Sequence, residues 1–255
     1  MIRIQNLAAG YGGRKVLQNV SMTLEAGRIT AIIGPNGCGK TTLLKTLTGI
    51  VPLSGGSITV SGIDIQTLSS AQLARQIAYL PQNRRPPDIS VLRMVLHGRF
   101  PYLSYPRRYR AEDLSAAREA LQWAGLDGLE QELVSRLSGG MQQKAYIAMA
   151  LAQDTNGILM DEPTTFLDVA HQLRLMEMAR QLAQEGKAVV MVLHDLSQAL
   201  RIADTVAVLQ DGRLIQSGTS EEIYSGGMLE QVFGITVRRY PTDSGWQYYC
   251  SALKA

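Results

Sequence analysis

The feature that most constrains the fold of this 255-residue chain is a glycine-rich loop between two regular elements. Residues 29–33 form an apolar run that predicts a buried β-strand, and residues 43–47 predict a helix. The loop between them matches the pattern G-x-x-x-x-G-K-[ST] through Gly34, Pro35, Asn36, Gly37, Cys38, Gly39, Lys40, Thr41 and Thr42. A strand, this loop and a helix in that order predict a phosphate-binding loop in an α/β protein.

The residue types of this loop explain how it would bind phosphate. Glycines let backbone N–H groups turn toward phosphate oxygens, and the following helix presents its positive N-terminal end. Lys40 is expected to reach the β- and γ-phosphates of a nucleotide, and the hydroxyl of Thr41 is expected to bind Mg²⁺. Cys38 occupies a variable position of the pattern, where the main interpretation is a small space-filling residue and the alternative is a redox role.

The rest of the chain alternates between short apolar strands and helices. Strand-like runs occur at residues 29–33, 77–80, 157–160, 188–193 and 206–209. Helix-like stretches occur at residues 91–96, 112–124, 139–153 and 220–233. This alternation predicts an α/β fold with a largely parallel sheet.

The strand-like runs stop between Leu80 and Gly157, which divides the chain. We interpret residues 83–154 as a helical subdomain inserted into a core of residues 1–82 and 155–220, with residues 221–255 as a C-terminal extension. A hairpin is predicted at Asp211-Gly212. Six aromatic residues of the last part are expected to pack the extension: Tyr224, Phe233, Tyr240, Trp246, Tyr248 and Tyr249.

Composition excludes several classes of protein. Lys plus Arg is 25 and Asp plus Glu is 22, so the net charge of +3 does not indicate a polybasic nucleic-acid binder. The strongest apolar stretch, residues 188–193, is much shorter than the roughly 20 residues that span a bilayer. The N-terminus shows no export signal, and Cys38 and Cys250 are too few for a disulfide framework, so we expect a protein of the cytoplasm.

Two further strand ends carry residues suited to catalysis. The run at residues 157–160 leads into Asp161-Glu162, at the sheet edge where ligands bind in open α/β sheets. Asp161 is expected to hold Mg²⁺ through its water shell, and Glu162 to polarise the attacking water. The run at residues 188–193 ends at His194, which is expected at the same edge.

A second glycine-containing segment, residues 137–141, reads Leu-Ser-Gly-Gly-Met before a helix, with Ser138 as the expected N-cap. With the motifs above, it makes the chain resemble the nucleotide-binding subunit of an ATP-binding cassette (ABC) transporter. The resemblance implies the P-loop NTPase cassette fold, with a mostly parallel core, an N-terminal antiparallel β part and an inserted helical subdomain. In this family, Ser138, Gly139 and Gly140 would close on ATP held by a second cassette, so the resemblance implies a dimer of like or similar chains.

The resemblance also assigns roles to single residues. Tyr11 matches the aromatic residue that stacks on adenine, and Gln82 matches the glutamine that joins the γ-phosphate and Mg²⁺ region to the helical subdomain. Asp168 belongs to the D-loop match at residues 165–168, and His194 matches the histidine that contacts the γ-phosphate. Met141 and Lys144 depart from the usual glutamine and arginine of the signature region, and the latter change replaces a planar fork with a point charge.

A finer resemblance lies in residues 90–102, which include Gly98-Arg99-Phe100-Pro101, and in His171-Gln172 after the D-loop. These residues look like the cassette subunits of importers for ferric siderophores, haem and cobalamin. The resemblance implies a protein at the cytoplasmic face of the membrane, a separate permease that contacts residues 83–110, and a substrate-binding protein that delivers the cargo. The alternative for residues 90–102 is a helix that packs into its own subdomain.

Three other functions are compared with this one. A soluble cassette ATPase that acts on DNA or ribosomes usually has coiled-coil insertions or two cassettes, and neither is present in this sequence. A GTP-switch protein would need an Asn-Lys-x-Asp element, which the sequence lacks. An exporter cassette would share the nucleotide motifs and is left open.

Overall fold

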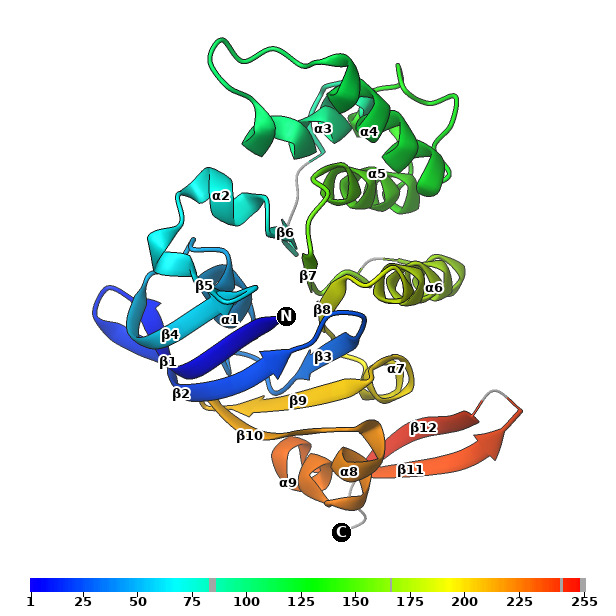
Figure 1. The fold of residues 1–255 in the computed structure, drawn as a ribbon. Helices are drawn as coiled ribbons and strands as arrows, with labels where there is room; N and C mark the ends of the chain where they lie inside the picture. The colour runs from blue at the N-terminus through cyan, green and yellow to red at the C-terminus, as the bar shows by residue number, and fades with distance from the viewer. Residues whose placement is uncertain (83–85, 166, 244, 253–255) are drawn as a thin grey trace.

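The computed structural model describes residues 1–82, 86–165, 167–243 and 245–252. Its largest sheet has six strands in the order β10-β9-β3-β8-β7-β6, and its first five strands along the chain pair in parallel (Figure 1). They are β3 (Ile29–Ile33), β6 (Ile77–Leu80), β7 (Gly157–Asp161), β8 (Ala188–Val192) and β9 (Thr205–Gln210). β10 (Arg213–Gly218) returns antiparallel to β9. The predicted α/β fold is confirmed.

A second, antiparallel sheet forms the N-terminal β part that the family resemblance implies. It consists of β2 (Arg14–Leu24), β1 (Ile2–Tyr11), β4 (Leu53–Val60) and β5 (Ile63–Asp64), in that order. Apolar residues of this sheet share one core with helix α1 (Lys40–Leu47) and the inner strands, through residues such as Leu17, Leu44 and Val190. The short helices η1 (Ile65–Thr67) and α2 (Ser70–Ala74) then lead into β6. This core fixes the helix that begins at Lys40 against both sheets.

The other face of the six-stranded sheet is covered by α6 (Val169–Gln184) and α7 (Leu196–Ile202). Leu175 and Ala179 of α6 and Leu200 of α7 pack against β-branched residues of the inner strands. Every residue of β3, β7 and β8 is buried, as expected for strands covered on both faces. In the ranges that the structure describes, no helix has the length and apolar character needed to cross a bilayer.

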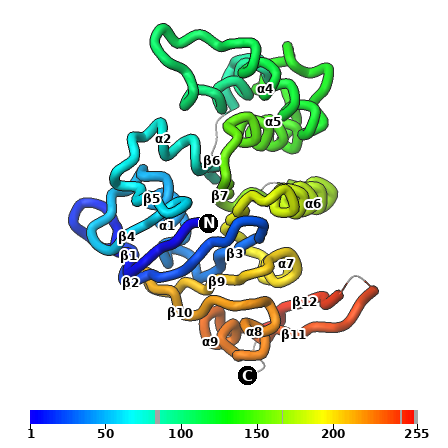
Figure 2. The backbone as a smooth tube through the Cα atoms, viewed as in Figure 1, coloured from blue at the N-terminus to red at the C-terminus, as the bar shows by residue number. Residues whose placement is uncertain are grey.

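Between β6 and β7 the chain forms a helical segment with its own core. It contains α3 (Val91–Leu96), η2 (His97–Tyr102), α4 (Ala111–Trp123), η3 (Val134–Arg136) and α5 (Gly139–Ala152). Val95, Leu121 and Ala148 belong to its apolar cluster. Figure 2 shows this segment at one end of the molecule and the C-terminal hairpin at the other. The inserted helical part of the predicted fold is confirmed.

Within this segment, Arg99 is an internal residue. Its Nε lies 3.0 Å from Oδ1 of Asp113, and one of its terminal nitrogens donates to the carbonyl oxygen of Ala152 at 3.0 Å. The Tyr102 hydroxyl donates to the carbonyl of Gln153 at 3.0 Å, so both side chains cap the C-terminal end of α5. The alternative given above, packing within its own subdomain, therefore holds for Arg99, whereas Phe100 is 40% exposed.

The C-terminal part differs from the predicted single helix over residues 220–233. Gly227 has φ 64°, which ends one helix and starts another: α8 (Ser220–Ser225) and α9 (Met228–Phe233). The hairpin β11 (Ile235–Thr242) and β12 (Gly245–Ala252) follows and was not predicted. By contrast, the hairpin at Asp211-Gly212 is confirmed, with φ 48° and 75° at the two turn residues.

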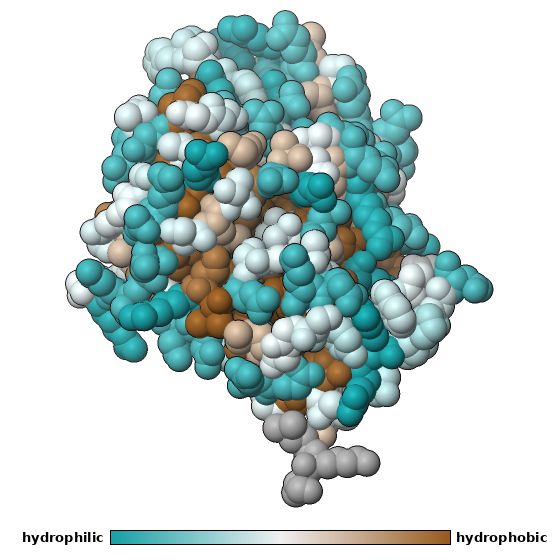
Figure 3. Space-filling view, turned by 60° about the horizontal axis from the view of Figure 1, so that its bottom comes forward, coloured by the Kyte–Doolittle hydropathy of each residue, from teal (hydrophilic) through white to brown (hydrophobic). Residues whose placement is uncertain are grey.

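The aromatic residues of this extension are only partly packed. Tyr248 is buried, but Tyr240, Trp246 and Tyr249 are about half exposed, so the prediction that they pack is wrong for these three. The reason is that one part of the hairpin lies on α7 and its far part extends into solvent (Figure 1). Seen from this end of the molecule, hydrophobic side chains form separate patches among hydrophilic ones (Figure 3).

Candidate active site

The glycine-rich loop joins the buried strand β3 to α1, as predicted. Gly37 and Gly39 have φ 78° and 106°, in the left-handed region that glycine favours. A side chain on Gly34 would place its Cβ 2.1 Å from the carbonyl oxygen of Leu209, so only glycine fits there. The N-cap residue Gly39 offers no side-chain hydrogen bond to α1, and the first N–H groups of that helix therefore remain available to an anion.

The side chain of Lys40 folds back over this loop. It is 6% exposed, and its Nζ donates to the carbonyl oxygens of Gly34 at 2.7 Å and Pro35 at 2.9 Å. Sγ of Cys38 lies 4.0 Å from the same nitrogen. Burial raises the pKa of the Cys38 thiol, which agrees with a neutral, space-filling side chain. The ammonium group is thus centred among the backbone groups of the loop.

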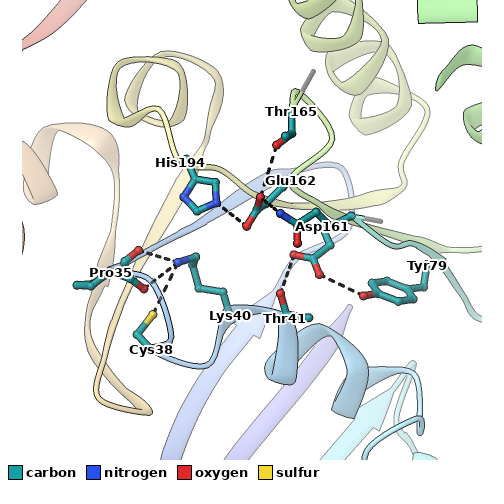
Figure 4. A network of polar contacts seen from close by, with 11 residues as sticks. Pro35, Cys38, Lys40, Thr41, Tyr79, Asp161, Glu162, Thr165 and His194 are labelled. Atoms are coloured by element: carbon teal, nitrogen blue, oxygen red, sulfur yellow. Dashed lines mark hydrogen bonds and ion pairs between the residues drawn. The ribbon is translucent and has the colours of Figure 1, made fainter. Parts of the chain in front are cut away.

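Asp161, the last residue of β7, is fully buried beside the start of α1. Its Oδ1 accepts a hydrogen bond from the Thr41 hydroxyl at 3.1 Å, and its Oδ2 accepts one from the Tyr79 hydroxyl at 3.2 Å (Figure 4). Burial raises the pKa of Asp161 despite these two hydrogen bonds. A hydroxyl and a carboxylate oxygen side by side are the hard donors that Mg²⁺ prefers.

The residues present fit a magnesium ion that is held mainly through other ligands. Among the described residues, no group of three or more His, Cys, Asp or Glu side chains could hold a metal by itself. Mg²⁺ usually keeps several waters and binds one or two carboxylates together with the phosphates of a substrate. Thr41 and Asp161 supply such a partial set next to the glycine-rich loop.

Glu162 contacts side chains that follow three different strands. Its carboxylate contacts the Gln82 amide after β6 and the His194 ring after β8, and it lies 3.5 Å from the Thr165 hydroxyl (Figure 4). Its backbone N–H donates to the carbonyl of Val192 at 3.2 Å. The residue has φ 50°, a left-handed conformation that costs on the order of 1 kcal/mol for a residue with a side chain. The sharp turn directs its carboxylate toward the loop side of the sheet.

Sequence reasoning missed two members of this cluster, Tyr79 and Thr165. Tyr79 is the one residue of β6 with a hydroxyl group. A polar group near the end of an otherwise apolar strand could have marked it as a candidate in the sequence. Thr165 is the first residue of the D-loop match at residues 165–168, but the resemblance assigned it no contact with Glu162. Both lie within hydrogen-bonding reach of a carboxylate that was predicted.

The structure places the other predicted residues elsewhere. Tyr11 ends β1 and is 50% exposed. Ser138 is the N-cap of α5, as predicted, and its hydroxyl accepts from the Met141 N–H at 3.4 Å, so Gly139 and Gly140 lie in the first turn of α5. Asp168 is the N-cap of α6, and hydrogen bonds from the backbone and ring of His171 lower the pKa of its carboxyl. Phe166 of the D-loop match lies outside the described residues.

The two departures from the signature pattern lie on α5. Met141 packs against the apolar cluster of the helical segment, so its side chain has a structural use there. Lys144 lies on the same helix, and its Nζ would be 3.6 Å from a Cβ placed on Gly125. Neither side chain contacts the loop that begins α1 in any described hydrogen bond or ion pair.

Comparison with known proteins now gives the family. A family model described as ABC transporter matches residues 17–165, more than half of the chain. This chain belongs to the ABC transporter family. The family resemblance inferred from the motifs is thereby confirmed, and the ATP-binding subunits of this family hydrolyse ATP to power transport.

Curated relatives cover nearly the whole of this ABC transporter chain. It is 41% identical over 236 residues to the ferric enterobactin transport ATP-binding protein of Escherichia coli (strain K12), which covers 92% of the chain and 87% of the relative. It is 39% identical to the iron(3+)-hydroxamate import ATP-binding protein of Bacillus subtilis (strain 168), over 91% and 87%. It is also 39% identical to the hemin import ATP-binding protein of Agrobacterium fabrum, over 92% of each.

Solved structures agree with this assignment. An inward-facing ABC transporter, provisionally assigned to the metal-chelate type, has a TM-score of 0.85 and 28% identity, over 99% of this chain and 97% of the other. A nucleotide-free ATP-binding cassette from an ABC transporter has a TM-score of 0.82 and 26% identity, over 91% and 96%. The match over 99% of the chain includes the C-terminal helices and hairpin as well as the cassette core.

Proposed function

We propose that this chain is the ATP-hydrolysing subunit of an ABC importer for a ferric siderophore or a related iron chelate. Relatives named for ferric enterobactin, petrobactin and iron(3+)-hydroxamate support the cargo class. A haem importer is the nearest alternative, since one relative is named for hemin import. A cobalamin importer, an exporter cassette and a non-transport ABC ATPase are the remaining alternatives.

The observation that supports ATP hydrolysis most strongly is that a lysine, two carboxylates and a histidine meet at one sheet edge (Figure 4). We propose that Lys40 leaves the carbonyl oxygens of Gly34 and Pro35 and binds the β- and γ-phosphates of ATP, which the backbone N–H groups of residues 36–42 surround. Thr41 and Asp161, with Gln82, would hold Mg²⁺, which neutralises charge on the phosphates when bound.

Glu162 is the proposed general base. Its carboxylate is 11% exposed and is already held by Gln82 and His194, so it has a fixed direction from which to accept a proton from the attacking water. His194, whose side chain is 46% exposed, can turn from Glu162 toward the γ-phosphate. Because Gln82 and His194 hold the base in place, the main contribution of the protein to hydrolysis is to position the reacting groups, and not to form covalent bonds with them.

The remaining predicted residues are proposed to act with partners. Tyr11 would stack on adenine, and Ser138, Gly139, Gly140 and Asp168 would face the nucleotide of a second cassette, most simply a second copy of this chain. The exposed part of residues 83–110 would contact a membrane permease, to which a substrate-binding protein delivers the cargo, and residues 83–85 lie outside the described residues. We infer no nucleic-acid partner, and we place the protein at the cytoplasmic face of the membrane.

The domain division follows the same proposal. Residues 1–82 and 155–220 would form the nucleotide-binding core, residues 83–154 the helical signature subdomain, and residues 221–255 the C-terminal extension. The helical segment has an apolar cluster of its own, and α5 joins it to the core of the six-stranded sheet through Ile147 and Ala150. We propose that the segment moves as a unit about this contact of α5 with the sheet.

Glu162→Gln tests the proposed base. We expect the variant to bind ATP as the unchanged protein does, and we expect its turnover to fall by about 10²- to 10⁴-fold because it cannot accept a proton. Since ATP then persists, light scattering should show an ATP-dependent dimer. Glu177→Gln, the same change at an exposed position of α6, is the matched control and should hydrolyse ATP normally. Normal hydrolysis by Glu162→Gln would contradict the assignment.

The cargo is tested with the intact transporter. Membranes of the native cell are solubilised, the chain is captured, and the multi-span protein that accompanies it is identified by mass spectrometry. ATPase activity of the complex is then measured with ferric siderophores, haem and cobalamin, each with its binding protein. Stimulation by a ferric siderophore supports the proposal, stimulation by haem or cobalamin selects that alternative, and the absence of a membrane partner would remove the importer function.

A further inference from the structure

His171, a residue that the proposed function does not use, connects two functional segments of the chain. It lies in the first turn of α6, and its Nδ1 is 2.8 Å from Oδ1 of Asp168. The backbone N–H of His171 donates to the same oxygen at 2.8 Å. Because an ionised carboxylate only accepts hydrogen bonds, Nδ1 carries the proton and the ring orientation is fixed by Asp168.

The far edge of the same ring lies against Gly140 in the signature segment, residues 137–141. A Cβ on Gly140 would lie 2.5 Å from both Cδ2 and Nε2 of His171 and 2.9 Å from Cε1. Gly140 does not have a left-handed φ, so its backbone would accept another residue. A larger residue at position 140 would therefore force the ring, which Asp168 holds, to move.

Side-chain amides of three glutamines near His171 also hold the loop that runs from Glu162 to Asp168. Nε2 of Gln172 donates to the Leu167 carbonyl at 3.1 Å, and its Oε1 accepts from Nε2 of Gln198 on α7 at 2.7 Å. From the signature helix, Nε2 of Gln143 donates to the Pro163 carbonyl at 3.0 Å. The loop that follows Glu162 is thus bonded to α5, α6 and, through Gln172, to the helix after His194.

We propose that His171 is a positioning residue that holds the signature segment at Gly140 and the D-loop carboxylate of Asp168 in one fixed arrangement, so that both meet the second cassette together. This inference rests on the proposed function, in which residues 138–140 and Asp168 face the nucleotide of a second cassette. Both contacts are needed to fix the two segments relative to each other, because the hydrogen bond to Asp168 sets the orientation of the ring and the opposite edge of the ring sets the distance to Gly140.

Three substitutions separate the two contacts. The backbone N–H of residue 171 still donates to Asp168 in every variant, so only side-chain contacts change. His171→Phe keeps a ring against Gly140 but loses the ring hydrogen bond to Asp168, and His171→Asn keeps an amide N–H for Asp168 but removes the ring edge. His171→Ala removes both. Each substitution is made in the full-length chain that also carries Glu162→Gln. The control is Arg174→Ala in the same background, because Arg174 is exposed and lies one helical turn after His171 on α6.

The first measurement is the ATP concentration at half-maximal dimer formation, followed by light scattering. We expect it to rise by about 2- to 30-fold in all three His171 variants, the range for residues that couple two sites. Affinity of the monomer for ADP, measured by calorimetry, should stay within about 2-fold, because no contact to residues 34–42 changes. Arg174→Ala should match its parent in both measurements.

The second measurement tests the contact itself by thermal unfolding without nucleotide. Gly140→Ala should lower the unfolding midpoint by about 3–10 °C when His171 is present, and by much less in His171→Ala, where the clash is removed. Equal effects in both backgrounds would overturn the contact.

The outcomes also separate this inference from the proposed function. If Glu162→Gln dimerises with ATP and the His171 variants dimerise equally well, the inference is wrong and the proposed function stands. If Glu162→Gln with His171 intact forms no ATP-dependent dimer, the proposed function fails, and the inference fails with it. A loss of ADP affinity equal to the loss of dimer formation would assign His171 to general stability instead.

Discussion

Arg99→Ala should destabilise the isolated chain strongly, because Arg99 is an internal residue of the helical segment. Its side chain is 13% exposed and that of its partner Asp113 is 7% exposed. The substitution removes the ion pair at 3.0 Å, the hydrogen bond to the Ala152 carbonyl at 3.0 Å and the packing of the guanidinium over the Tyr102 ring at 4.0 Å. Asp113 keeps its hydrogen bond from the Arg110 N–H at 2.9 Å.

The magnitude follows from these contacts. Loss of one partner of a buried pair costs about 3–5 kcal/mol, and the remaining hydrogen bond to Asp113 places this case at the lower end, about 3 kcal/mol. For a chain of this size, each kcal/mol shifts the unfolding midpoint by about 2–4 °C, so the expected decrease is about 6–12 °C. Arg107→Ala is the control, since Arg107 is exposed and lies 5.8 Å from the Phe100 ring, and it should shift the midpoint by less than about 3 °C.

The pH dependence gives a second check. Burial acts to raise the pKa of Asp113, but hydrogen bonds from the Arg110 N–H and from Arg99 outweigh it and hold the pKa below its ordinary value of 3.8. A carboxyl with a lowered pKa in the folded state contributes stability above its unfolded pKa and loses it as the pH falls through the folded value. The difference between the unchanged chain and Arg99→Ala should therefore be full at pH 7 and should shrink below about pH 4.

The assay is thermal unfolding of the purified chain without nucleotide, followed by circular dichroism, with ATP affinity measured separately at a low temperature. We expect ATP affinity to remain near that of the unchanged chain, since Arg99 makes no contact with residues 34–42. If Arg99→Ala unfolds at the same temperature as Arg107→Ala and loses only permease-stimulated ATPase activity, Arg99 contacts the permease and our reasoning is refuted.

Three further predictions concern other positions. Asp161→Asn should be at least as stable as the unchanged chain at pH 7 but should lose Mg²⁺-dependent ATP binding. Burial raises the pKa of Asp161, so the stability that this carboxyl contributes is lost as the pH rises through that pKa. A lower unfolding midpoint of the variant at pH 7 would contradict this reasoning. In a Cys250→Ser background, a maleimide should label Cys38 slowly at pH 7 and faster above pH 9, because burial raises the pKa of the Cys38 thiol. If protein that carries the label, identified by its mass, still binds ATP, Cys38 does not lie in the phosphate-binding loop as we place it. Gly98→Ala should lower the unfolding midpoint by roughly 4–8 °C, because its Cβ would lie 2.2 Å from the Met149 carbonyl oxygen, whereas Gly55→Ala, with 3.6 Å to the nearest atom, should have little effect.

Much of the core could be predicted because its signals are local. The apolar run at residues 29–33 became β3 with the same ends, and the run at residues 77–80 became β6 with the same ends. Strand order could not be predicted, since all five runs are short and apolar and nothing in the chain says that β3 lies between β8 and β9. The contacts among Gln82, Glu162 and His194 depend on that order. The sequence therefore predicted roles for these residues, which stay predictions, but not the contacts that the structure shows.

The C-terminal part was harder to predict for a different reason. Aromatic residues occur on both faces of the hairpin, and only the register of β11 with β12 decides which ones reach the core. Val237 and Tyr248 are buried, whereas Tyr249, one residue further along, points to the other face and is exposed. The sequence between residues 235 and 252 has no clear alternation that could have shown this difference.

The bonds of Lys40 to its own loop affect how any substitution of this lysine should be interpreted. Two carbonyl oxygens that point toward the ammonium group share it as a donor, so the lysine helps to hold the curvature of residues 34–39 before a nucleotide arrives. Removing the amine would leave those two oxygens facing each other without a donor, and the loop would relax. A Lys40 variant that fails to bind ATP would therefore report a changed backbone shape as well as a lost phosphate contact, and amide exchange of the loop without nucleotide can separate the two effects.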